Sequence, residues 1–236
     1  MSQLPVAQQP AALGFLPDLR ARATDPELLD AELPAAEALK SLADLRLVNR
    51  WLSRRGGLLR AVAPHLPPQG RLLDVGCASG DVAAWLSTRL ARSGLTVGVD
   101  LKPLHLRHAP PAVRRVAADA SRLPFSDRSF DVVTASLFLH HFDEAELGLL
   151  LCELARVARR AIVVSDLERA LVPFVFARAV FPWFFETPVS VHDGLLSIRR
   201  GFREPELRAA FAAAGLDDVR IARQFPYRLL AVAALP

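Results

Sequence analysis

The chain has 236 residues, which suits one large α/β domain with a full hydrophobic core better than two equal domains. Hydrophobic residues make up 52% of it and aromatic residues only 7%, so we expect a core built mainly from Ala, Val and Leu. The net charge is only +4, and its sources are spread along the chain, so the sequence pI of about 9.8 is weak support for a nucleic-acid partner.

Cysteine usage and apolar runs bear on where the protein works. Cys77 and Cys152 are too few for a disulfide framework, and no positively charged start followed by an apolar run opens the chain, so we expect a cytoplasmic location. No apolar run has the roughly 18–20 residues of a membrane span. The nearest, residues 171–185, contains two prolines and Arg178, which leaves an amphipathic lid or an interfacial helix as interpretations.

The first 66 residues are predicted to form an N-terminal arm and a helical cap. Residues 1–24 are rich in Ala, Pro and Gln without periodicity, which is typical of a mobile or loosely docked arm. Residues 24–26, Thr-Asp-Pro, predict a capped helix start. Apolar residues spaced three and four apart predict a further helical stretch over residues 34–62, and the prolines of residues 64–68 end it.

From residue 67 onward the pattern alternates between strands and helices. Strands are predicted over residues 71–76, 95–100, 113–118, 130–136, 161–165, 218–223 and 227–233. Helices are predicted over residues 81–92, 143–157 and 204–215. Such alternation predicts a parallel, doubly wound α/β sheet. Residues 67–236 are therefore predicted to form the main domain, with a cap insertion at about residues 167–202.

The run Leu72-Leu73-Asp74-Val75-Gly76-Cys77-Ala78-Ser79-Gly80 ends a buried strand with an acid and then turns through small residues into a helix. Gly76 and Gly80 permit a tight turn and let a ligand approach the backbone, and the helix N-terminus beyond them offers unpaired amides. Asp74 can balance a cationic ligand group. Taken alone, this run also fits an ordinary strand-to-helix turn.

Two more acids follow the next two predicted strands. Asp100 lies at the end of the second strand, where a carboxylate can accept hydrogen bonds from both hydroxyls of a ribose. Asp119 follows the third strand. Each acid alone fits a solvated turn, but three acids at the ends of consecutive strands indicate one ligand site along the sheet edge.

On these motifs, residues 71–164 resemble the class I S-adenosylmethionine-dependent methyltransferases, especially the subgroup with quinone-biosynthesis and other small-molecule methyltransferases. The resemblance implies a Rossmann-like sheet of seven strands with the last one antiparallel, and S-adenosylmethionine as cofactor. It implies that the methionine part is held at Asp74, Gly76, Cys77, Ala78 and Gly80, the ribose at Asp100 and Leu101, the adenine at Asp119 and Ala120, and the reaction centre at Ser136 and Leu137.

The chain departs from the resembled family at Ala78, where that family usually has glycine. The extra methyl group predicts altered cofactor affinity rather than lost binding. A nicotinamide dehydrogenase on the same kind of sheet would need the spacing Gly-x-Gly-x-x-Gly, which this turn lacks.

Three histidines are candidates for a catalytic base. Methyl transfer from a sulfonium needs mainly in-line placement and exclusion of water, but a hydroxyl acceptor also benefits from a base. His140 and His141 follow the fourth strand, although they could equally cap or pack the next helix. His192 stands beside Asp193 and fits either a base or a polar turn. No metal site is predicted, because neither cysteine has a metal partner nearby.

The predicted insertion concentrates aromatic residues in a chain that has few. They are Phe174, Phe176, Phe181, Trp183, Phe184 and Phe185. We expect Trp183, Phe184 and Phe185, with His192, to line an apolar acceptor pocket, while the alternative is that the aromatics seal the cap to the sheet. The predicted acceptor is a polyketide, a phenol or a quinone precursor, methylated at oxygen or carbon, with no nucleic acid bound and no more than peripheral membrane contact.

Two other functions remain open at this point. An RNA or protein methyltransferase has the basic pI as its support, yet the residues after the fourth strand, Ala-Ser-Leu-Phe, lack the Pro-Pro-aromatic pattern of base-modifying relatives. A noncatalytic cofactor-binding protein would bind the cofactor without transferring its methyl group.

Overall fold

A seven-stranded sheet lies at the centre of the protein, and its strand order is β3-β2-β1-β4-β5-β7-β6. The computed structural model describes residues 17–30, 33–51, 55–90 and 94–236. The strands are β1 (Leu72–Val75), β2 (Thr96–Asp100), β3 (Arg114–Ala117), β4 (Phe130–Ser136), β5 (Ala158–Leu167), β6 (Arg220–Gln224) and β7 (Arg228–Ala234). β1 to β5 pair in parallel, and β7 runs antiparallel to both β5 and β6. The predicted fold class is confirmed.

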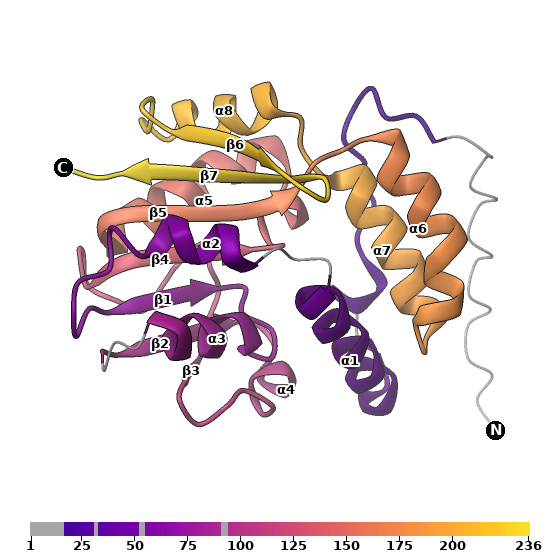
Figure 1. Ribbon diagram of the computed structural model, residues 1–236, viewed down its shortest axis with the longest axis horizontal. Coiled ribbons are helices and arrows are strands. Elements are labelled where there is room, and N and C mark those ends of the chain that lie inside the picture. The colour runs from indigo at the N-terminus through magenta and orange to yellow at the C-terminus, as the bar shows by residue number, and fades with distance from the viewer. Residues whose placement is uncertain (1–16, 31–32, 52–54, 91–93) are drawn as a thin grey trace.

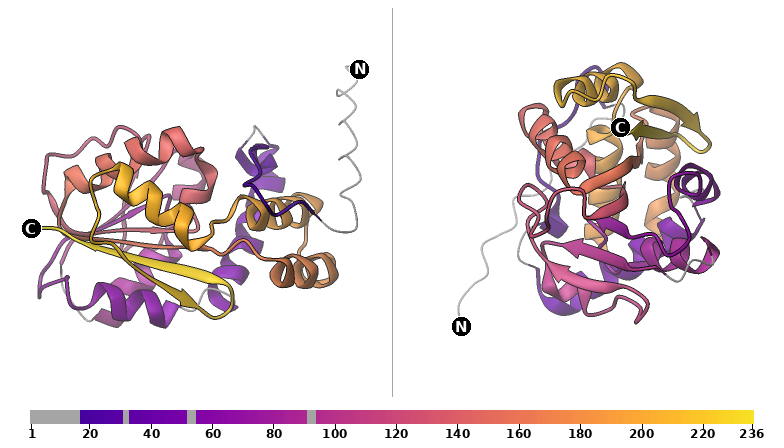
Figure 2. Two further views of the ribbon diagram at one scale, coloured as in Figure 1. Left: turned by 90° about the horizontal axis from the view of Figure 1, so that it is seen from above. Right: turned by 90° about the vertical axis from the view of Figure 1, so that its left-hand side faces the viewer.

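Helices cover both faces of the sheet, with α5 and α8 on one side and α2 and α3 on the other (Figure 2). The α-helices are α1 (Ala35–Trp51), α2 (Arg55–Val62), α3 (Asp81–Leu90), α4 (Pro103–Leu106), α5 (Glu144–Val157), α6 (Leu171–Phe184), α7 (Pro188–Arg200) and α8 (Glu204–Ala213). There are also two short 3₁₀ helices in the described residues, η1 (Leu28–Asp30) and η2 (Leu139–His141).

The start of α5 follows directly from its sequence. The Asp143 side chain accepts a hydrogen bond from the Glu146 backbone amide, and the Glu146 side chain accepts one from the Asp143 amide, which is the capping box that the sequence predicts. Leu147, Leu151 and Leu154, at helical spacing, are buried against the sheet. This packing fixes the position of η2, which immediately precedes the helix.

The opposite face is sealed by α2 and α3. Leu58 and Val62 of α2 pack with Leu86 of α3 and with Val132 and Val163 of the sheet. Helix α2 therefore covers the sheet, whereas α1 contacts α7 at the carboxyl end of the strands. The predicted division of the chain at residue 66 stays a prediction.

The segment before α1 differs from the sequence-based expectation. Residues 22–27 have no helical structure, and only the short turn η1 follows the Thr-Asp-Pro run. The reason is a long-range one: the Leu28 and Leu29 amides donate to the carboxylate of Asp193 in α7, both at 2.8 Å. The part of the predicted arm that covers residues 1–16 lies outside the described residues.

Helices α6 and α7 form the predicted helical insertion after β5, and they stand at the carboxyl ends of the parallel strands (Figure 1). They have a small core of their own, in which Phe174 and Phe181 of α6 pack with Leu195 and Ile198 of α7. Among the described helices, none combines the length and the apolar character needed to cross a membrane.

Candidate functional site

The turn between β1 and α3 enters the left-handed backbone region three times. Gly76, Ala78 and Gly80 have φ angles of +66°, +46° and +64°. A Cβ atom at Gly76 would lie 2.1 Å from Cδ2 of Phe138, so this position needs glycine for its backbone and for its lack of a side chain. At Ala78 this conformation costs an L-residue about 1–2 kcal/mol, which gives a physical reason for the glycine of the resembled family.

Asp74 is buried within β1, and its carboxylate accepts a hydrogen bond from the hydroxyl of Thr134, whose Oγ1 lies 2.8 Å from Asp74 Oδ1. Burial raises the pKa of Asp74 to about 7. A cation placed beside this carboxylate would stabilise its ionised form. The site therefore fits the ammonium group of S-adenosylmethionine.

Asp100 is the last residue of β2, and its carboxylate joins two turns. Its Oδ2 accepts a hydrogen bond from the Ala78 amide and its Oδ1 accepts one from the Lys102 amide, both at 2.9 Å. His105 Nδ1 lies 3.3 Å from Oδ1. An ionised carboxylate offers about four lone-pair sites, so Asp100 can still accept hydrogen bonds from ribose hydroxyls. Leu101, next to it, is exposed.

The third acid is arranged differently. Asp119 lies two residues beyond β3 and accepts hydrogen bonds from the amide and the hydroxyl of Ser121, both at 2.8 Å. These bonds lower the pKa of Asp119, and its side chain is exposed. The carboxylate thus stabilises its own turn, and the buried Ala120 beside it faces the core. A role of these two residues at an adenine stays a prediction.

The residues at the end of β4 lie beside the glycine turn. Ser136 and Leu137 border a small hollow at the glycine turn, together with Asp74, Gly76, Cys77, Ala78, Val82 and Leu45. Leu137 also has a positive φ, +53°, and its amide donates to the Ser165 carbonyl at 2.9 Å. The predicted cofactor residues of β1 and β4 are therefore side by side.

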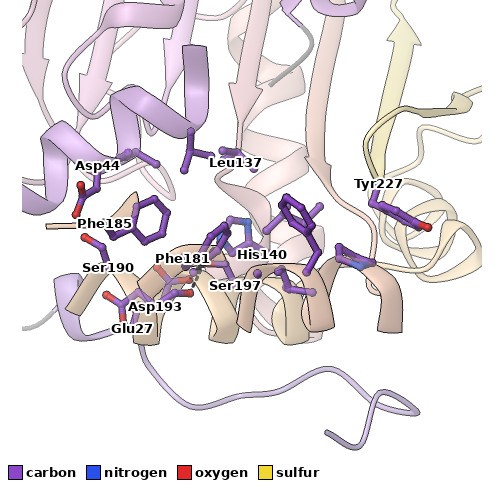
Figure 3. Close-up of a pocket in the computed structure, with 18 of the residues that line it drawn as sticks. Glu27, Asp44, Leu137, His140, Phe181, Phe185, Ser190, Asp193, Ser197 and Tyr227 are labelled. Carbon is purple, nitrogen blue, oxygen red and sulfur yellow. Dashed lines mark hydrogen bonds and ion pairs between the residues drawn. The ribbon is translucent and has the colours of Figure 1, made fainter. Parts of the chain in front are cut away.

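A larger cavity opens next to this hollow, between the sheet edge, α1 and the helices α6 and α7 (Figure 3). Its volume is about 600 Å³. Leu45 of α1 and Leu137 line both spaces, so the cavity adjoins the glycine-turn hollow. Apolar side chains dominate its wall, among them Val48, Leu137, Phe176, Phe181 and Phe185.

A buried cluster of charges lies at one wall of the cavity. His140 is 3% exposed, and its Nδ1 lies 2.7 Å from Asp166 Oδ1 while its Nε2 lies 3.5 Å from Glu27 Oε1. Burial alone would lower the pKa of His140, but the charge of Asp166 and the bonds to both carboxylates raise it to about 9. The ring is therefore an imidazolium at neutral pH, and it has no lone pair left to take another proton.

The pKa values of the two carboxylates in this cluster shift in the opposite direction. Burial would raise the pKa of Asp166 and of Glu27, but the charge and hydrogen bond of His140 outweigh it and lower both to about 2. Arg200 Nε donates to the His140 carbonyl at 2.8 Å, and Arg22 Nη2 donates to the Phe142 carbonyl at 2.9 Å. The cluster fixes the N-terminal segment, η2 and α7 relative to one another.

His141 is the more accessible of the two adjacent histidines and also lines the cavity. Its Nε2 lies 3.8 Å from Glu27 Oε2. In the described part of the chain, Glu27, His140 and His141 place potential ligand atoms within 4.8 Å of one another, as a metal ion would need. The ion pairs of His140 with Glu27 and Asp166 already account for this geometry without an ion, and the expectation of no metal stays a prediction.

The predicted pocket residues separate into two groups. Phe185 lines the cavity, whereas Trp183 and Phe184 do not and are 87% and 65% exposed. His192 is also absent from the cavity wall, and its Nδ1 is bound to Asp193 Oδ1 at 2.9 Å. Trp183 and Phe184 point outward because the other side of α6 packs on α7. A role of Trp183, Phe184 and His192 in acceptor binding stays a prediction.

Two residues of the cluster were missed from the sequence. Asp166 is an acid near the carboxyl end of β5, and the rule that singled out acids after the first three strands would have found it. Glu27 lies in a segment without periodicity, and it reaches His140 only through tertiary contacts, so no local pattern points to it.

Comparison with known proteins agrees with this geometry. Residues 73–163 match the family described as "Methyltransferase domain". A demethylmenaquinone methyltransferase of Roseiflexus sp. (strain RS-1) is 30% identical over 218 residues, which are 85% of this chain and 86% of that protein. One from Thermus thermophilus is 31% identical over 203 residues, covering 78% and 89% of the two chains.

The fold has a counterpart among solved structures. A SAM-dependent methyltransferase from Aquifex aeolicus superposes with a TM-score of 0.63 at 16% identity, over 87% of this chain and all of that one. The strand order, the glycine turn beside Asp74 and the extent of the sequence matches lead to one conclusion. The chain belongs to the class I S-adenosylmethionine-dependent methyltransferases and is a homologue of the demethylmenaquinone methyltransferases.

Proposed function

We propose that this methyltransferase acts on a small lipophilic or aromatic acceptor, such as a polyketide, a phenol or a quinone precursor, and methylates it at oxygen or carbon. The observation that supports this proposal is the apolar cavity of about 600 Å³ that joins the hollow at the glycine turn. A space of this size suits a drug-sized molecule. A cytoplasmic location and the absence of a nucleic-acid partner remain expectations.

The chain's own residues would bind and orient the reactants. When bound, S-adenosylmethionine supplies a methyl group that is already activated on a sulfonium. Asp74 would pair with the ammonium group, and Asp100 would accept hydrogen bonds from the ribose hydroxyls. Leu45 and Leu137 border both spaces, so an acceptor bound in the cavity would lie next to the hollow and could approach the methyl group in line.

His141 is the candidate general base for an acceptor hydroxyl. It lines the cavity and is the more accessible of the two histidines. His140 is held as an imidazolium by two carboxylates, and its role is to fix the position of η2, to which it belongs. Glu27 lies beside both rings and would stabilise the charge that His141 gains when it takes a proton. An acceptor that reacts at carbon has less need of this base.

The experiment measures S-adenosylhomocysteine released by the purified chain with candidate acceptors. Two relatives are named demethylmenaquinone methyltransferases, so demethylmenaquinone is the first acceptor to test, followed by phenols and naphthols. The proposal expects turnover with at least one of them, and His141→Gln should slow turnover of a hydroxyl acceptor at unchanged cofactor affinity. Methyl transfer to RNA or protein alone, or cofactor binding without any transfer, would contradict it.

A further inference from the structure

Helix α6 leaves an unusually apolar surface exposed. Ten large apolar side chains are exposed in the described residues, and six of them belong to this one helix of 14 residues. These are Leu171, Val172, Val175, Phe176, Trp183 and Phe184. Figure 1 shows α6 at the outer end of the protein, beside α7. We call these six residues, together with the exposed Phe225 of the β6–β7 turn, the α6 face.

The helix is apolar on both of its sides. Phe174, Ala177 and Phe181 face α7 and are buried there, while the α6 face points outward. A helix that is hydrophobic all round is normally enclosed by protein or by lipid. At 14 residues it is about 21 Å long, too short for a bilayer core of about 30 Å, so it can lie in a membrane surface but not cross it.

The charges on α6 favour a lipid headgroup region. The helix contains no acidic residue, and its single charge is Arg178, which is exposed at the edge of the α6 face when the residues are projected at helical spacing. Trp183 is near the end of the helix, and tryptophan is enriched where a membrane meets water. A symmetric contact with a second copy centred on the middle of α6 would bring two Arg178 side chains toward each other, whereas an anionic headgroup would pair with one.

The α6 face is continuous with the mouth of the cavity. Val172, Phe176 and Phe225 are exposed and also line the cavity. We infer that the α6 face docks on the surface of an anionic lipid bilayer, with the cavity mouth turned toward the lipid. If the proposed function holds, an apolar acceptor dissolved in the bilayer would enter the cavity without crossing water.

Co-sedimentation with vesicles tests this inference without any acceptor or methyl transfer. We expect the full chain to bind vesicles of phosphatidylcholine with phosphatidylglycerol more tightly than phosphatidylcholine alone, and binding should weaken as salt rises. The double variant Val175→Ser/Trp183→Ser, whose residues lie outside the cavity wall, should lose roughly tenfold in vesicle affinity. Arg178→Glu should remove the preference for anionic lipid.

Leu149→Ser is the matched control, because Leu149 is 73% exposed on α5 and is not part of the α6 face. It should bind vesicles as the wild type does. Calorimetry with S-adenosylhomocysteine on every variant checks that the fold is intact. A wild-type chain that stays in solution with every lipid, or equal losses in the control, would overturn the inference. So would a dimer that the double variant abolishes, which would assign the face to a second copy.

Discussion

His140 Nδ1 lies 2.7 Å from Asp166 Oδ1 in a site where both side chains are almost completely buried. The pair connects η2, just after β4, to the end of β5, and Glu27 extends it to the segment before α1. The charged imidazolium therefore connects three segments of the chain at the cavity wall through ion pairs with two carboxylates. We expect its protonation to determine how firmly the segment before α1 is held to the sheet.

Alkaline pH should weaken the ion pairs of His140 with Asp166 and Glu27. The folded-state pKa of His140 is raised to about 9 from 6.5, so its contribution to stability is fully present below about pH 6.5 and is lost as pH rises through 9. We predict that the free energy of unfolding falls by about 2 kcal/mol between about pH 7 and 9. Urea denaturation across this range measures it.

The comparison variants for this pH effect are His140→Gln and His108→Gln. His140→Gln should remove most of the alkaline slope and should itself destabilise the protein by about 3–5 kcal/mol, because it leaves two buried carboxylates without their cation. His108 is exposed, so His108→Gln should keep the slope. An unchanged slope in His140→Gln would refute the assignment of the effect to this ring.

The glycine turn should be intolerant of a single methyl group. Gly76→Ala would place a Cβ atom 2.1 Å from the Phe138 ring at a φ of +66°, so we predict a loss of about 2–4 kcal/mol in the free energy of unfolding and weaker cofactor binding. Gly148→Ala is the control, since its Cβ would meet only Ala213 Cβ, at 3.7 Å. Within α5 it should stabilise by about 0.5–1 kcal/mol. Similar effects of both substitutions on thermal unfolding would argue against a special role of this turn.

Two exposed aromatic residues of the α6 face should separate acceptor binding from other roles. Phe176 and Phe184 are 52% and 65% exposed, but only Phe176 lines the cavity. We predict that Phe176→Ala raises the KM for the acceptor roughly tenfold in detergent-free solution, because it removes apolar contact area from the ligand. Phe184→Ala should leave this KM unchanged. The reverse order in steady-state kinetics would place the acceptor elsewhere.

Sequence reasoning succeeded where local pattern and topology agree. The alternation of strands and helices, with right-handed crossovers, places β1 and β2 side by side, and so Asp74 and Asp100 come to one edge. It could not place Trp183 and Phe184, because both sides of α6 are apolar and periodicity cannot say which side faces the cavity. Glu27 could not be predicted either, since its partners lie more than a hundred residues away.

The central claim is that acids at neighbouring strand ends bind S-adenosylmethionine, and Asp100 tests it most directly. Isothermal titration calorimetry with S-adenosylhomocysteine should give saturable binding to the wild-type chain. Asp100→Ala should weaken it by about tenfold to a hundredfold, as expected from the loss of two ribose hydrogen bonds. No heat with the wild-type chain, or equal affinity in the wild type and Asp100→Ala, would contradict this account of the site.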